Sequence, residues 1–192
     1  EEYLPLVELN NAAWPDEPSE PKVWHFRDKQ WPQDKLYSRF IALDGDRMIV
    51  EGAYMEPHWA KAPGKYLYFY SALPGYEERA NLHKQIYGFV LEKLAERQPK
   101  FLGTDTREDR TFRVNWLESQ GFRPQMRFPV SDLDVTNFDF SRFNGAHERV
   151  ADAGVQIIPL AEVRERDPRW MEKLYEMLWE IDQDVPQPDP PV

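Results

Sequence analysis

Residues 65–94 constrain the fold of this chain more than any other stretch. They read "KYLYFYSALPGYEERANLHKQIYGFVLEKL", an aromatic apolar run, a turn with one glycine, and a longer amphipathic segment. The nearly continuous apolar run predicts a central strand that is covered on both faces. The apolar stripe of the second half predicts a helix; its members are Leu82, Ile86, Phe89, Val90 and Leu94. The stretch is therefore a strand–turn–helix unit.

The flanking segments predict a mixed sheet around this unit. "SRFIALDGDRMIVEGAY" (38–54) has two β-rich runs on either side of an Asp-Gly turn, which is typical of a hairpin. Further strands are expected at 101–106 and 123–133, with a helix between them that Gly121 ends. Two short helices are expected before the hairpin. The predicted class is α/β (α+β), with a mixed sheet flanked by helices.

The pattern of predicted elements changes after residue 134. A helical connector (135–154), a short strand "VQIIPL" (155–160) and a helix that starts at Asp167-Pro168 are expected there. "LYEMLWEIDQDVPQPDPP" also echoes "LVELNNAAWPDEPSEP", which lies 168 residues earlier. One interpretation is the start of a second, repeated domain. The other is a chance match between two amphipathic helices that end in prolines.

Composition excludes several functional classes. A formal net charge of −10 argues against a nucleic-acid partner, whose phosphates need clustered Lys and Arg. The chain has no cysteine, and its 4 histidines lack metal-ligand spacing, so no metal site is expected. No apolar run is long enough to span a membrane, so no membrane partner is expected either. A cytoplasmic protein is the default expectation.

The order of elements, together with three local motifs, resembles the GNAT superfamily of N-acetyltransferases over residues 3–133. "YFYSALPGYEERANLHKQIYGFVLEKL" is similar to that family's fourth strand, pyrophosphate loop and following helix. "WLESQGF" (116–122) is similar to the end of the family's next helix, and "FIALDGDRMIVEGAY" to its second and third strands. The resemblance implies a mostly antiparallel central sheet flanked by helices.

The resemblance also implies acetyl-CoA as co-substrate and a small amine as acceptor. Acetyl and pantetheine groups would bond to the strand backbone at Tyr70, Ser71 and Ala72. The pyrophosphate would lie on backbone N–H groups at the helix start, where the helix dipole favours an anion. That segment consists of Glu77, Glu78, Arg79, Ala80, Asn81 and Leu82.

Three side chains are candidates for the proton transfer that attack by an amine requires. Glu51 and Tyr54 lie on the second strand of the hairpin and are expected to face the acceptor cleft. His58 lies in "MEPHWAKAPGK", the loop that leads into the central strand, and is a candidate base. Core or surface roles are the alternative for all three.

Glu77, Ala80 and Leu82 stand where the family's loop has Gln or Arg, Gly, and Gly or Ala. This supports a second interpretation, a non-catalytic GNAT-fold module, natural or engineered. Its 66–87 region would form an apolar patch for a homodimer or a protein partner.

The resemblance further suggests the first domain of a tandem protein, or a fragment of one. Residues 1–134 would be the GNAT-like domain, 135–154 the connector and 155–192 the start of a second repeat. In that arrangement the 155–160 strand would complete the first sheet beside the 38–44 strand.

Overall fold

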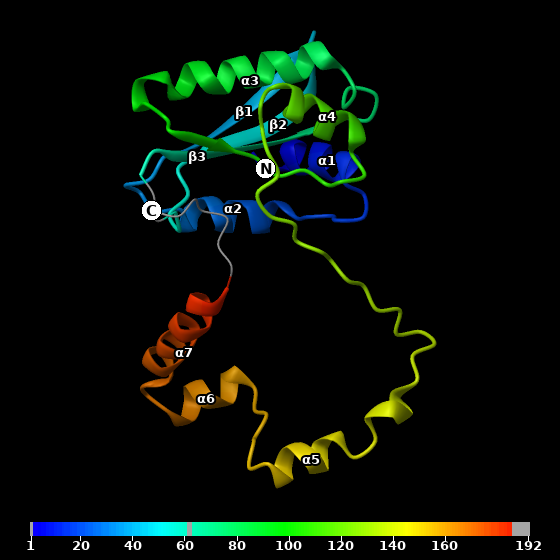
Figure 1. Cartoon of the computed structure of the whole chain (residues 1–192), viewed down its shortest axis with the longest axis vertical. Coiled ribbons are helices and arrows are strands. Elements are labelled where there is room, and N and C mark those ends of the chain that lie inside the picture. Colours follow the sequence, from blue (N-terminus) through cyan, green and yellow to red (C-terminus); the bar gives the residue numbers. More distant parts are fainter. Residues whose placement is uncertain (1, 61–62, 186–192) are drawn as a thin grey trace. The chain divides into compact units, whose positions relative to one another are not determined.

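The computed structural model describes residues 2–60 and 63–185 of the chain (Figure 1). These residues form two compact units, one up to residue 124 and one from residue 125 onward. The first unit contains the whole described sheet, and the second is built from short helices.

The sheet of the first unit has four strands in the order β1-β2-β3-β4. The strands are β1 (Tyr37–Asp44), β2 (Arg47–Met55), β3 (Lys65–Ala72) and β4 (Phe101–Gly103). β1, β2 and β3 pair antiparallel, and only β3 and β4 pair parallel. Gly45 takes a φ of 61° in the two-residue turn between β1 and β2, a backbone conformation that glycine adopts without strain. The predicted mixed, mostly antiparallel sheet is confirmed.

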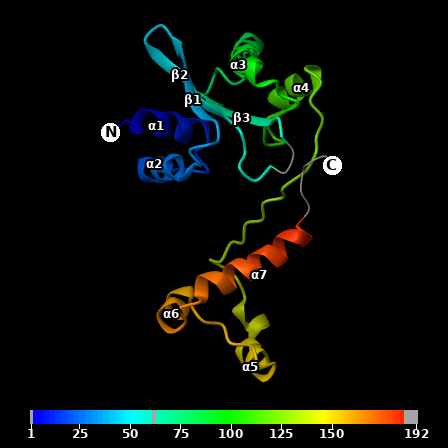
Figure 2. The same cartoon turned by 90° about the vertical axis from the view of Figure 1, so that its left-hand side faces the viewer.

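Helices cover both faces of this sheet (Figure 2). α3 (Ala80–Leu94) lies on one face, and α1 (Leu4–Ala13) and α2 (Pro21–Gln30) lie on the other. The short η1 (Ala95–Arg97) follows α3. Side chains of a strand alternate between faces, so cross-strand partners share a face. Tyr68 and its partner Tyr54 face α3, whereas Ser71 and its partner Glu51 face α1.

The predicted stripe of α3 forms the main core with the β3 tyrosines. Val90 and Leu94 are completely buried, and Leu82 and Ile86 are nearly so. Tyr66, Tyr68 and Tyr70 pack against them from the sheet. The apolar patch that the second interpretation placed at 66–87 is therefore not exposed; most of its aliphatic and aromatic side chains belong to the core.

α4 (Thr111–Ser119) packs beside the first half of α3. The Trp116 ring lies 5.3 Å from His83 and 5.8 Å from Tyr87, measured between ring centroids. Gly121 has a φ of 89°, and the Phe122 N–H donates to the Leu117 carbonyl at 3.1 Å. This is the geometry of a glycine that ends a helix, as the sequence predicts.

The second unit contains η2 (Phe140–Phe143), α5 (Ala146–Asp152), α6 (Leu160–Arg166) and α7 (Trp170–Asp184). η2 and α5 lie within the stretch expected to be helical (135–154), and α7 is the expected final helix. The strands expected at 123–133 and 155–160 are not formed, and α6 instead begins at Leu160. Prolines interrupt both stretches and their apolar side chains are exposed, so neither can join a ladder or bury one face. A second repeat over 155–192 stays a prediction.

Substitution of alanine at two glycines should change the free energy of unfolding in opposite directions. A Cβ at Gly52 would lie 2.5 Å from Phe40 Cζ and 2.6 Å from the Phe69 carbonyl oxygen, whereas a Cβ at Gly88 meets nothing within 4 Å. We expect Gly52→Ala to lower the free energy of unfolding by about 1–3 kcal/mol. Gly88→Ala, in the middle of α3, should raise it by about 0.5–1 kcal/mol.

Urea denaturation of the two variants and the parent chain measures both effects. Equal shifts in the same direction would contradict the close packing of β2 between Phe40 and β3.

Candidate functional site

The sheet opens beside the second half of β3. Parallel pairing with β4 stops at Leu67 and Gly103, whereas β3 continues to Ala72. Leu73 N–H donates to the Ile49 carbonyl at 2.9 Å, so odd-numbered residues here direct their backbone groups towards β2. Since N–H and C=O groups alternate sides along a strand, the backbone of Tyr70 and Ala72 faces the opening. Ser71, also predicted to contact the co-substrate, directs its backbone to β2.

A buried arginine from α4 enters this opening. Arg113 Nη1 donates to the Tyr70 carbonyl at 3.0 Å, and its guanidinium carbon lies 4.0 Å from the centroid of the Tyr70 ring. Nη2 lies 3.5 Å from Thr104 Oγ1. The residue is 9% exposed, and its Nε has no hydrogen-bond partner among the described residues. Arg113 was not among the residues predicted from the sequence, where its i, i+4 spacing with Leu117 indicates only a shared, buried helix face.

The start of α3 opens on a pocket of about 520 Å³. Helix residues begin at Ala80, and no side chain caps the first turn. Arg79 stacks on Tyr76, with 3.8 Å between its guanidinium carbon and the ring centroid. Leu82 is buried in the core below, so its side chain leaves the pocket open. The pocket is lined by Leu43, Asp44, Ile49, Tyr76, Arg79, Ala80, Asn81, Leu82 and Gln85.

Glu77 and Glu78 lie in the turn just before this helix. Glu78 is exposed and Glu77 is half-buried, with an Oε2 atom that has no partner in the described part of the chain. Both carboxylates lie close to the helix start, which favours negative charge. Neither of them lines the pocket. Among the residues that do, Arg79 is the only cation and Asp44 is the only anion.

His83 ties this turn to β3. Its Nε2 lies 2.7 Å from the Glu77 carbonyl oxygen, and its Nδ1 contacts the Tyr70 hydroxyl. A carbonyl only accepts, so Nε2 carries the proton and Nδ1 accepts from Tyr70. Burial lowers the pKa of His83, against the raising effect of the Glu77 carbonyl. The neutral ring therefore bridges strand and loop, a role the sequence does not disclose.

Glu51 lies on the other face of the sheet, opposite Ser71. It is 5% exposed, and its Oε2 lies 3.9 Å from Arg39 Nη1. Burial raises the pKa of Glu51 to about 7, although the Ser71 hydroxyl and Arg39 lower it. A carboxyl with this pKa exchanges a proton near neutral pH, as a general base must.

Ser71 connects Glu51 to the end of α1. Its hydroxyl donates to Asn10 Oδ1 and accepts from Trp14 Nε1, both at 3.0 Å. Trp14 in turn lies under the Arg110 guanidinium, with 4.5 Å between the guanidinium carbon and the ring centroid. The opening is therefore bordered by the loop after α1 and the segment that leads into α4.

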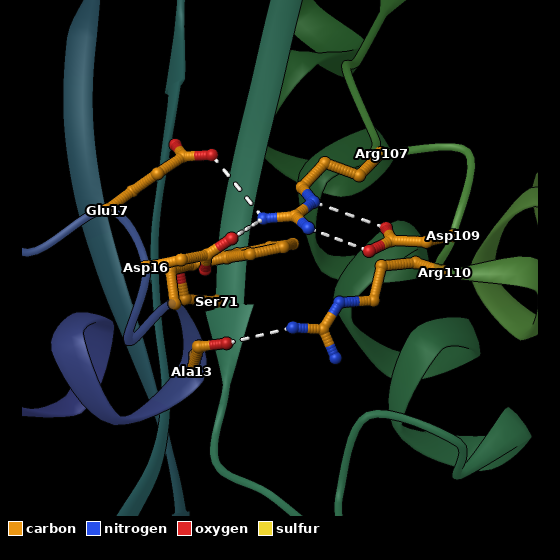
Figure 3. A network of polar contacts seen from close by, with 8 residues as sticks. Ala13, Asp16, Glu17, Ser71, Arg107, Asp109 and Arg110 are labelled. Atoms are coloured by element: carbon orange, nitrogen blue, oxygen red, sulfur yellow. Dashed lines mark hydrogen bonds and ion pairs between the residues drawn. The ribbon is translucent and has the colours of Figure 1, made fainter. Parts of the chain in front are cut away.

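Ion pairs hold these two loops together (Figure 3). Arg107 contacts Asp16 and Glu17 from the first loop and pairs through Nη2 with Asp109 at 2.7 Å. Arg110 Nη2 donates to the Ala13 carbonyl at 3.0 Å. These contacts fix the loops that flank the opening.

The other two predicted catalytic side chains lie elsewhere. Tyr54 faces α3 and packs on Phe89, with 6.3 Å between ring centroids. His58 is exposed and contacts Trp31 and Trp59 beyond the far end of β2. From Ser71 to Leu67, at that end, β3 runs four residues, about 13 Å. The structure brings neither residue together with Glu51.

The described residues contain neither a metal-binding cluster nor a membrane-spanning helix. No group of three or more His, Asp or Glu side chains in that part of the chain is arranged to hold a metal ion. None of the described helices is both long and apolar enough to cross a membrane.

Comparison with known proteins identifies the fold. No protein-family model and no curated protein matches this chain significantly. Among solved structures, AAC(6')-Iy in complex with the bisubstrate analogue CoA-S-monomethyl-acetylneamine is similar, with a TM-score of 0.50 and 16% identity. The match covers 70% of this chain and 93% of that one.

Two further structures agree. Aminoglycoside 6'-N-acetyltransferase AAC(6')-IG from Acinetobacter haemolyticus has a TM-score of 0.50 at 13% identity, covering 70% of this chain and 94% of that one. A transcriptional regulator from Bacillus halodurans C-125 has a TM-score of 0.52 at 12% identity, covering 69% and 95%. The chain therefore has the GNAT fold that the sequence predicts.

Glu51 should make stability depend on pH in a defined direction. Its folded-state pKa of about 7 lies above that of an unfolded glutamate, about 4.3, so the folded state binds the extra proton between these values. Its contribution to the free energy of unfolding therefore falls by roughly 2–3 kcal/mol as the pH rises from about 5 to about 8. Glu51→Gln should remove this fall.

Urea denaturation at several pH values measures the difference between the two chains. The titration of His83 changes the free energy of unfolding equally in the parent chain and in Glu51→Gln, so its effect cancels in the difference. Glu118→Gln, at an exposed position on α4, controls for the loss of one negative charge. A parallel pH dependence of parent and Glu51→Gln would contradict the raised pKa.

Proposed function

We propose that this chain, which folds as the GNAT N-acetyltransferases do, transfers an acetyl group from acetyl-CoA to a small amine. The observation that carries the proposal is the open edge of β3 next to the uncapped start of α3. One site then offers strand backbone for an amide-rich chain and helix N–H groups for a pyrophosphate. That combination suits the two ends of the pantetheine diphosphate portion of CoA.

The residues present fit this co-substrate. The N–H groups of Ala80 and Asn81 and the Arg79 side chain would hold the pyrophosphate, since the Leu82 N–H already donates to the Arg79 carbonyl at 2.9 Å. The backbone of Tyr70 and Ala72 would bond the acetyl and pantetheine groups. Burial of Leu82 keeps the pocket accessible although the loop lacks the family's glycines.

Glu51 is the side chain we assign to the acceptor. An attacking amine must first lose a proton, and Glu51 has a pKa that suits this near neutral pH. It lies on β2 opposite Ser71, so that β3 separates it from the open edge, and it is shielded from solvent. We therefore expect the proton to reach Glu51 through a water relay rather than by direct contact. The net charge of −10 would favour the approach of a cationic acceptor.

Binding of acetyl-CoA tests the proposal first. At about 100 times its Kd, a ligand that binds only the folded state raises the free energy of unfolding by about 2.7 kcal/mol. Arg79→Glu should weaken binding roughly tenfold or more, because it replaces the one cation that lines the pyrophosphate pocket, beside Asp44, with a second carboxylate. Lys84→Glu makes the same change on α3 at an exposed position outside the pocket and should have little effect.

Isothermal titration calorimetry with acetyl-CoA measures these affinities. Release of free CoA thiol in the presence of a panel of small amines then measures transfer. Absence of any thermal shift or heat at millimolar acetyl-CoA would overturn the proposed function. Equal weakening by the two charge reversals would overturn the assignment of the pocket.

A further inference from the structure

We propose that Arg113 is a catalytic residue that stabilises the thiolate of CoA as it leaves. This inference rests on the proposed function and assigns to its site the group that receives the negative charge of the reaction. The guanidinium would act by charge and hydrogen bonding, and would not give up a proton.

The hydrogen bonding of Arg113 is incomplete for a buried cation. Its side chain is 9% exposed, and Nη1 donates to the Tyr70 carbonyl at 3.0 Å. Nη2 has only a 3.5 Å contact with Thr104, and Nε has no partner in the part of the chain that the structure describes. No ion pair joins Arg113 to a carboxylate of the described residues. Burial raises the pKa of Asp105, and Arg113 is near enough to lower it against that effect, but the two side chains form no ion pair. A buried guanidinium that is neutralised only from a distance is costly, which favours an anion as a direct partner.

The position of the guanidinium fits a sulfur at the reacting centre. Tyr70, whose carbonyl it bonds, also supplies one of the backbone N–H groups that face the opening. A thioester held there would place its sulfur near Arg113. Only Arg113 and Leu117 of α4 are buried, and Leu117 cannot donate a proton. The buried face of α4 therefore provides a positive charge for the leaving thiolate but no general acid to protonate it.

The proposed transfer forms one bond and breaks one bond at the acetyl carbon. The lone pair of the neutral amine forms the C–N bond to the acetyl carbon, and the C–S bond breaks. The sulfur keeps the bonding electron pair and leaves as CoA thiolate, paired with Arg113. The proton lost by the amine passes towards Glu51 and then to solvent.

Comparison of CoA with desulfo-CoA, which lacks the thiol, isolates this interaction. Calorimetry from about pH 7 to about pH 9 gives the ratio of the two affinities, and ultraviolet absorbance of the thiolate gives the pKa of bound CoA. We expect the parent chain to lower that pKa by about one unit from its free value, a roughly tenfold preference for the thiolate. Arg113→Gln should abolish the preference, and Arg113→Lys should keep part of it.

Arg97→Gln is the matched control, since it makes the same substitution at an exposed position on η1, outside the site, and should leave the ratio unchanged. The ratio is internal to each variant, so lower stability does not imitate the result. If Arg113→Gln does not fold, the parent and Arg113→Lys still decide the point.

An unshifted thiol pKa in the parent, with CoA bound and acetyl transferred, would overturn this inference alone. Tighter binding of both ligands by Arg113→Gln would also overturn it, and would show that Arg113 only closes the opening. Failure of the parent to bind either ligand would overturn the proposed function and this inference together.

Discussion

The unequal pairing of β3 is the constraint on which the rest of the site depends. On one side its residues pair with β2 from Leu67 to Ala72, and on the other its pairing with β4 ends at Leu67. A buried strand cannot leave backbone groups unpaired without cost. Something must therefore satisfy the free half of the edge, and in this chain Arg113 bonds one carbonyl of it. The other groups are the ones proposed to receive a ligand.

The site also separates charges between the two faces of the sheet. Glu51 lies under the α1 end, whereas Arg113 approaches the edge of β3 from α4. In an acyl transfer the amine loses a proton and the sulfur gains an electron pair. Opposite charges on two sides of β3 suit both changes. Glu51 would act on the amine nitrogen, and Arg113 would act on the thioester sulfur. Trp14, Ser71 and the ion pairs of Arg107 keep the two sides in place.

Periodicity predicted most of the first unit correctly. The hairpin, the central strand, α3 and the glycine that ends α4 all carry local signals, because each depends on side-chain spacing or on one special backbone angle. The stretches 123–133 and 155–160 have β-rich composition, but their prolines and exposed side chains leave them without a ladder. In the site, position alone indicated the loop at 77–82. The spacing of Arg113 and Leu117 indicates only that they share a helix face. The roles of Arg113 and His83 arise from contacts with Tyr70, which no sequence spacing encodes.

The first turn of α3 differs from most helix ends, which fray and lose order within a turn. Leu82 is held in the core, and His83 bonds the carbonyl of Glu77, which precedes the helix. A ligand that binds N–H groups at a frayed end must first order them and bears that entropy itself. Here folding has already fixed the N–H groups at the start of α3. A ligand that binds them would therefore lose less conformational entropy and bind more tightly. His83, which takes no part in the proposed chemistry, would thus lower the entropic cost of binding a ligand at this helix end.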